Sequence, residues 1–113
     1  MLKIYHNPRC KKSREGLALL EESGQNFEVI KYLDKPLSTK ELEQIISKLN
    51  IDPLDLVRKH ESIWKSHFKD KEMSSDAIIK AMIDYPKLME RPIVVKDNKA
   101  IVGRPPKLIL SII

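Results

Sequence analysis

The chain lacks several residue types that would point to particular protein classes: among 113 residues it has one cysteine and three glycines, and aromatic residues make up 5%. One cysteine cannot form a disulfide within the chain, which excludes a disulfide-stabilised framework. The histidines lack the close spacing and cysteine partners of zinc ligands, so we expect no metal site. No apolar run is long enough to span a membrane, and we expect no membrane partner. No basic stripe interleaved with aromatics is present, so direct nucleic-acid binding is not expected.

The residues that are present are typical of a single globular domain spanning 1–113. Apolar residues make up 42%, and 21 Lys and Arg against 16 Asp and Glu leave a formal charge of +5. This excess of positive charge favours small anionic substrates or acidic partners. Without a signal-peptide pattern or a disulfide, we expect a cytoplasmic protein.

The first third of the chain has the pattern of a strand, a helix and a second strand. Apolar and polar residues alternate over 2–5, and Asn7-Pro8 ends that strand. An amphipathic helix follows from Ser13 to Gly24, and 27–32 reads as the next strand. This order predicts a βαβ unit with parallel strands.

Residues 34–90 are predicted to be largely helical. Ser38 with Glu41 forms a capping-box pattern at the start of one helix, and further helices are expected after Asp52 and Ser74. Between them, residues 60–73 are polar apart from Ile63, Trp64 and Phe68, and we expect a mobile surface segment with one anchoring aromatic residue.

The last part of the chain returns to strand character. Residues 91–96 and 99–102 read as a hairpin, and a helix over 107–113 follows. The whole order predicts an α/β fold: a thioredoxin-like four-stranded mixed sheet with a helical insertion at about 34–90.

Cys10 is the candidate nucleophile, because it lies where the first strand turns into a helix. Four cationic residues surround it: Arg9, Lys11, Lys12 and Arg14. Positive charge and a helix amino terminus both lower the pKa of a thiol, and both attract an oxyanion. A thiolate beside an anion site predicts attack of sulfur on a negatively charged substrate.

A proline at the start of the third strand would face the Cys10 turn in a thioredoxin-like fold. That residue is Pro92, and a cis Arg91-Pro92 bond is plausible there. Arg91 and Arg104 would then lie near Cys10, with two exposed arginines at strand ends as the alternative. Ser13 stands where a Cys-x-x-Cys motif would place its second thiol, so an adduct on Cys10 needs an external thiol. The Ser13 hydroxyl would donate to the thiolate or cap the helix.

Together these residues resemble the ArsC family of arsenate reductases, in particular the glutaredoxin-coupled class and its short relatives. The segments that carry the resemblance stand in family order and spacing: Ile4 to Pro8, Cys10, Ser13-Arg14, Leu56 to Arg58, Glu90 to Val94 and Gly103 to Pro106.

The resemblance implies that Cys10 attacks arsenate while Arg58, Arg91 and Arg104 bind the oxyanion. It implies glutathione as co-substrate, glutaredoxin as partner and no bound cofactor. The supporting residues around the site would be His6, Asn7, Ser13, Arg14 and Pro92. His6 would either lower the Cys10 pKa by its charge or simply bond to backbone at the strand end.

Two alternatives remain open, because Lys11 and Lys12 stand where well-studied arsenate reductases have small residues. A glutathione-dependent thiol transferase would carry glutathione on Cys10. A thiol-based regulator similar to Spx would bind RNA polymerase, although Ser13 replaces the second cysteine of its switch.

Overall fold

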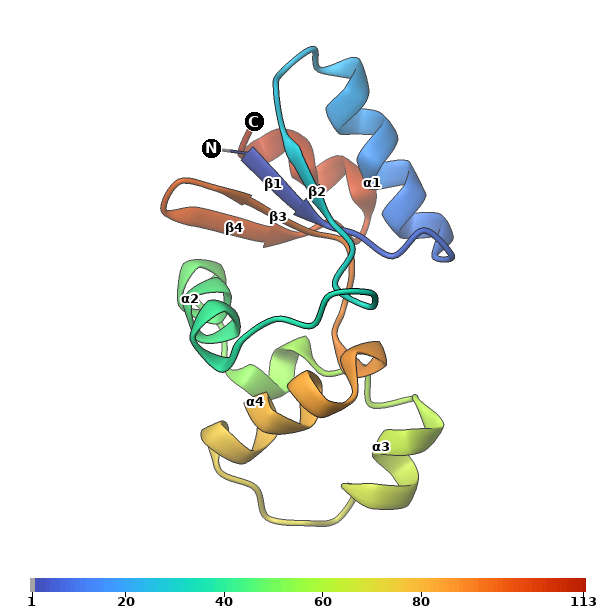
Figure 1. Ribbon diagram of the computed structural model, residues 1–113, viewed down its shortest axis with the longest axis vertical. Coiled ribbons are helices and arrows are strands. Elements are labelled where there is room, and N and C mark those ends of the chain that lie inside the picture. The colour runs from blue at the N-terminus through green and yellow to red at the C-terminus, as the bar shows by residue number, and fades with distance from the viewer. Residues whose placement is uncertain (1) are drawn as a thin grey trace. The chain divides into compact units, whose positions relative to one another are not determined.

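The computed structural model describes residues 2–113, which divide into two compact units (Figure 1). The sheet unit comprises the chain up to Lys35 together with Arg91–Ile113, and the helical unit is Pro36–Glu90. Each unit is described by itself, and the assignment of 1–113 to a single domain stays a prediction.

The sheet unit contains four strands in the order β2-β1-β3-β4. Their bounds are Leu2–Tyr5 for β1, Glu28–Ile30 for β2, Ile93–Lys96 for β3 and Lys99–Val102 for β4. β1 runs parallel to β2 and antiparallel to β3, and β3 and β4 form a hairpin. The predicted α/β fold with a mixed four-stranded sheet is therefore confirmed. β2 is shorter than the predicted strand over 27–32.

Two helices pack on this sheet and close its core. α1 (Lys11–Glu22) contacts η3 (Pro106–Ser111), a 3-10 helix at the carboxyl end of the chain. Leu20 from α1 and Ile109 from η3 are buried against the strand residues Ile4 and Val94. The helix predicted over 107–113 is thus present one residue earlier, in the tighter 3-10 form that follows Pro105 and Pro106.

Gly16 allows α1 to approach the rest of the sheet unit closely. A Cβ atom at this position would lie 2.8 Å from Cγ of Pro92 and 2.9 Å from Cδ1 of Ile109. Only a residue without a side chain fits at such distances, so Gly16 sets how near the helix comes to Pro92.

The helical unit is built from three α-helices and two short 3-10 helices in the region predicted to be helical. Their bounds are Thr39–Leu49 for α2, Pro53–Leu56 for η1, Ser62–His67 for α3, Ser75–Asp84 for α4 and Pro86–Leu88 for η2. The hydroxyls of Ser38 and Ser74 accept hydrogen bonds from Glu41 N–H and Ala77 N–H, both at 3.1 Å, so both serines act as N-caps. Leu42 of α2 and Met82 of α4 are buried, and the two helices contact each other.

The segment 60–73, which we expected to lie between helices, contains a helix of its own. Residues Ser62–His67 form α3, and the Trp64 and Phe68 rings stack with centroids 5.4 Å apart. Trp64 is buried and is the anchoring aromatic residue expected in this segment. Over residues 2–113, no helix is long and apolar enough to cross a membrane.

Candidate active site

Cys10 is the N-cap residue of α1, with extended backbone at φ −96° and ψ 123°. The turn before it is held by two hydrogen bonds to Asn7. Cys10 N–H donates to the Asn7 carbonyl at 3.0 Å, and Arg9 N–H donates to the Asn7 side-chain oxygen at 3.0 Å. The half-buried thiol is thereby fixed at the amino terminus of the helix.

Several groups around Cys10 act on its thiol, and their net effect lowers its pKa. Burial is the largest single influence and raises the pKa. The lowering influences together outweigh burial: hydrogen bonding from the Ser13 backbone, a hydrogen bond and the charge of Arg91, and hydrogen bonding from the Lys12 backbone. Backbone N–H groups of the first helical turn have no partner within the helix, so they are available to a thiolate. The arrangement therefore favours the nucleophilic form of the sulfur.

The Ser13 hydroxyl forms hydrogen bonds with the two residues that follow β1. It is fully buried, lies 2.7 Å from Nδ1 of His6 and accepts a hydrogen bond from Asn7 N–H at 2.9 Å. The hydroxyl thus takes neither of the two roles expected for it: it connects the end of β1 to α1, and the Ser13 backbone acts on the thiol instead.

Of the two roles considered for His6, the structure does not favour a positive charge that acts on Cys10. Burial is the largest influence on its pKa and lowers it, the charges of Lys31 and Arg14 lower it further, and the Ser13 backbone raises it in part. The lowered pKa favours the neutral imidazole near pH 7. His6 therefore acts as a hydrogen-bonding partner of Ser13.

The sequence contains no local signal for the effect of Lys31. His6 N–H donates to the Ile30 carbonyl at 2.9 Å, and this link between β1 and β2 brings the neighbouring Lys31 close. Sequence reasoning missed Lys31 for this reason.

Arg91 and Arg104 come together at the start of β3. Nη1 of Arg104 donates to the Arg91 carbonyl at 3.1 Å, and the Arg91 side chain reaches Cys10. The Arg91-Pro92 peptide bond is cis, as expected, and Gly103 N–H donates to the Pro92 carbonyl at 2.8 Å. The structure thus places Cys10, Arg91, Pro92 and Arg104 in one part of the sheet unit.

The other cationic residues near Cys10 interact with groups other than the thiol or are exposed. Nη1 of Arg14 donates to the Pro8 carbonyl at 3.0 Å, which braces the turn. Lys12 forms a loose ion pair with Glu15 at 3.8 Å, and both Lys11 and Lys12 are exposed.

Arg58 belongs to the helical unit, so its place beside Cys10 stays a prediction. Its guanidinium is held there by two neighbours: Nη1 lies 3.1 Å from Oε2 of Glu61, and Nη2 lies 2.9 Å from Nε2 of His60. The Arg58 side chain is only 12% exposed, which is typical of a positioned cation. The sequence gives no signal that pairs Arg58 with Glu61 or with His60, which is exposed.

Residues 2–113 contain no group of three or more His, Cys, Asp or Glu side chains that could hold a metal ion. The polar groups near the thiol are backbone N–H groups and guanidinium side chains. Such donors bind anions, so the chemistry that this site offers is nucleophilic sulfur beside an oxyanion site.

Comparison with known proteins identifies the family. The model of the ArsC family matches residues 5–112. The arsenate reductase of Neisseria meningitidis serogroup A is 45% identical over 106 residues, covering 92% of this chain and 91% of that protein. The arsenate reductase of Haemophilus influenzae is 42% identical over 112 residues, covering 97% of each. A solved arsenate reductase from Vibrio cholerae superposes with a TM-score of 0.94 at 44% identity, covering 99% of this chain and 97% of that one. The chain therefore belongs to the ArsC family.

Proposed function

We propose that this protein is an oxidoreductase that reduces arsenate to arsenite, with Cys10 as the nucleophile and glutathione as co-substrate. The observation that carries the proposal is the Cys10 thiol, whose pKa is lowered at the amino terminus of α1 beside Arg91. Family membership and relatives called arsenate reductases support arsenate as the substrate.

The oxyanion is held by guanidinium groups in this proposal. Arsenate carries negative charge on several oxygens near neutral pH, and a guanidinium binds two such oxygens with parallel charge-assisted hydrogen bonds. Arg91 and Arg104 are adjacent in the sheet unit. Arg58 is proposed as the third arginine.

The reaction begins when Cys10 Sγ bonds to arsenic and one arsenate oxygen leaves as water, taking up two protons. The thiol of glutathione then attacks Cys10 Sγ and loses its proton. The sulfur–arsenic bond breaks, its electron pair stays on arsenic, and arsenic goes from the +5 to the +3 state as arsenite. Cys10 is left in a mixed disulfide with glutathione, so the two sulfurs are what has been oxidised.

A second thiol must release Cys10, and we propose that glutaredoxin supplies it. Cys10 is the only cysteine of the chain, so no internal thiol is available to attack the mixed disulfide. Attack by an external thiolate on the glutathione sulfur returns Cys10 as a thiolate. This scheme needs a pool of reduced thiols, which favours a cytoplasmic location.

The deciding experiment is arsenate-dependent NADPH oxidation with glutathione, glutaredoxin and glutathione reductase. We expect turnover that Cys10→Ser abolishes, while Lys40→Ala, an exposed change on α2, leaves it intact. No turnover by a folded protein whose Cys10 still reacts with iodoacetamide would refute the proposal. Glutathione transfer without arsenate would then identify a thiol transferase.

Arsenate protection of Cys10 from alkylation tests the three arginines separately. We expect each change to Ala at Arg58, Arg91 and Arg104 to weaken protection, because each removes a charge-assisted contact to the oxyanion. A variant that keeps full protection would remove that arginine from the proposed site.

A further inference from the structure

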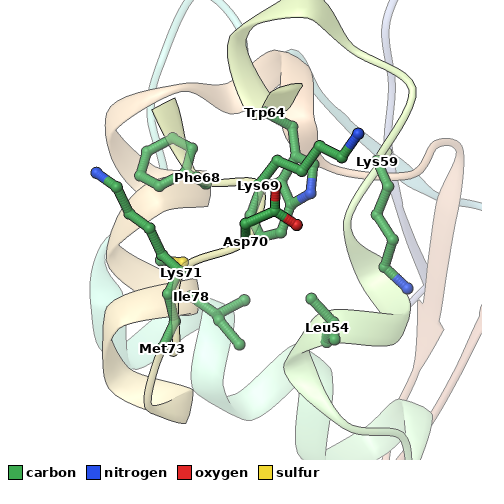
Figure 2. Close-up of a pocket in the computed structure, with 9 residues that line it drawn as sticks. All are labelled: Leu54, Lys59, Trp64, Phe68, Lys69, Asp70, Lys71, Met73 and Ile78. Atoms are coloured by element: carbon green, nitrogen blue, oxygen red, sulfur yellow. The ribbon is translucent and has the colours of Figure 1, made fainter. Parts of the chain in front are cut away.

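The helical unit contains a surface hollow of about 360 Å³ that the Cys10 chemistry does not use (Figure 2). Its walls come from η1, the segment containing α3 and the loop after it, and α4. All of these elements belong to the same unit, so the hollow is defined by that unit alone.

The floor of the hollow is apolar. Trp64 and Phe68 stack on one side, Ile78 lies below them, and Leu54 closes the opposite wall (Figure 2). Leu54 is 38% exposed, so part of its apolar side chain is accessible in the hollow. Met73 adds a flexible apolar side chain, which adapts well to a ligand. The floor therefore offers space for one or two large apolar side chains.

The rim of the hollow is cationic. Lys59, Lys69 and Lys71 line it together with one acidic residue, Asp70. Among residues 2–113, no acidic side chain forms an ion pair with any of these three lysines. Their ammonium groups are thus available to anionic groups of a ligand.

The loop that carries two of these lysines is fixed to α3. Lys69 N–H donates to the Trp64 carbonyl at 2.9 Å, and Lys71 N–H donates to the Phe68 carbonyl at 3.2 Å. Asp70 between them adopts a left-handed conformation with φ 67°. These contacts hold the backbone of the cationic rim beside the aromatic floor.

We propose that this hollow docks an acidic segment of a partner protein, with one or two large apolar side chains on the floor and flanking carboxylates on the lysine rim. Charge complementarity supports an acidic partner, because three lysines face one aspartate. A second copy of this chain fits less well, since its formal charge of +5 makes two copies repel each other. The interaction is separate from the proposed reaction at Cys10.

Trp64 provides a direct readout, because it is the only tryptophan of the chain and lines the hollow. The probe is an eight-residue peptide with a central Leu-Phe pair and three acidic residues on each side. We expect a saturable change in Trp64 fluorescence below about 1 mM peptide, weakened by added salt. The same peptide with Ala-Ala at its centre should give no saturable change.

Reversal of the rim charge tests the site. We expect the combined variant K59E, K69E and K71E to lower the affinity for the peptide by roughly tenfold. A variant with the same total charge, K40E, K99E and K107E, changes exposed lysines elsewhere and should bind within about twofold of the unchanged protein. Thermal unfolding of both variants verifies that they fold.

Three results would overturn the proposal. The first is no saturable fluorescence change with the folded, unchanged protein. The second is an equal loss of affinity in both triple variants, which would mean that only total charge matters. The third is a Trp64 signal that depends on protein concentration without peptide, which would assign the hollow to a second copy.

Discussion

Replacement of Gly16 by Ala tests how α1 is seated beside the candidate site. The added Cβ would lie 2.8 Å from Cγ of Pro92, a ring atom that can move only by a change of ring pucker. It would also lie 2.9 Å from Cδ1 of Ile109, whose side chain is fully buried. Since neither neighbour can move away freely, the amino-terminal half of α1, which follows Cys10, must shift.

Two opposing free-energy contributions set the expected magnitude. Overpacking of a buried contact costs about 2 kcal/mol of folding stability. An alanine inside a helix is about 1 kcal/mol more favourable than a glycine. We therefore expect Gly16→Ala to lower the free energy of unfolding by about 1 kcal/mol, which lowers the melting temperature by about 4 °C in a chain of this size.

The assay is thermal and urea unfolding followed by circular dichroism, with Ala18→Gly as the matched control. Ala18 is exposed on the same helix, so its replacement measures the propensity contribution without a steric one. The losses of unfolding free energy in Gly16→Ala and Ala18→Gly should sum to about 2 kcal/mol. The helix-propensity contributions of the two changes have opposite sign and cancel in this sum, so the sum equals the steric contribution. If Gly16→Ala stabilises the protein by as much as Ala18→Gly destabilises it, the close approach to Pro92 does not constrain α1.

Three further predictions concern the surroundings of the thiol. Arg91→Ala should raise the pKa of Cys10, because it removes a hydrogen bond and a positive charge. The rate of reaction with iodoacetamide should then rise at a higher pH than in the unchanged protein. A pH–rate profile that does not move would contradict this prediction. Ser13→Ala should lower the free energy of unfolding by about 2 kcal/mol, because the buried Asn7 N–H loses its hydrogen-bond acceptor. Urea unfolding measures this loss, and a loss below about 0.5 kcal/mol would refute the role of the hydroxyl. The pKa of His6 is lowered below 6.5, so the unfolded chain binds more protons and stability should fall as the pH drops below about 6.5. His6→Gln should reduce that fall in the urea midpoint between about pH 7.5 and pH 5.5, and an unchanged fall would assign it to other groups.

The sequence predicted much of the fold because the relevant signals are local. Alternation over 2–5, the break at Asn7-Pro8 and the cap at Ser38 each depend on residues a few positions apart. The buried Trp64 agrees with the aromatic anchor expected in 60–73, but the polar composition around it gave no signal for the helix α3. Packing of a buried side chain, rather than local composition, stabilises a short helix of this kind.

The candidate site was predictable where one short motif carries it. Cys10, Ser13 and the helix start stand together in the sequence, so a reactive thiol at a helix amino terminus follows from their order. The neutral state of His6 was not predictable, because Lys31 and burial, which lower its pKa, reach it only through the pairing of β1 with β2.

The sequence by itself determined the strand and helix order, the position of the single thiol and the lack of an internal partner for it. Only the tertiary structure decided which groups act on that thiol: the Arg91 side chain comes from the segment just before β3, far along the chain, and the Ser13 hydroxyl bonds to His6 instead. It also decided that an aromatic floor and three lysines form one hollow in the helical unit. The physical reason is that hydrogen bonds and charges act over a few ångströms, and only folding brings distant residues within that range.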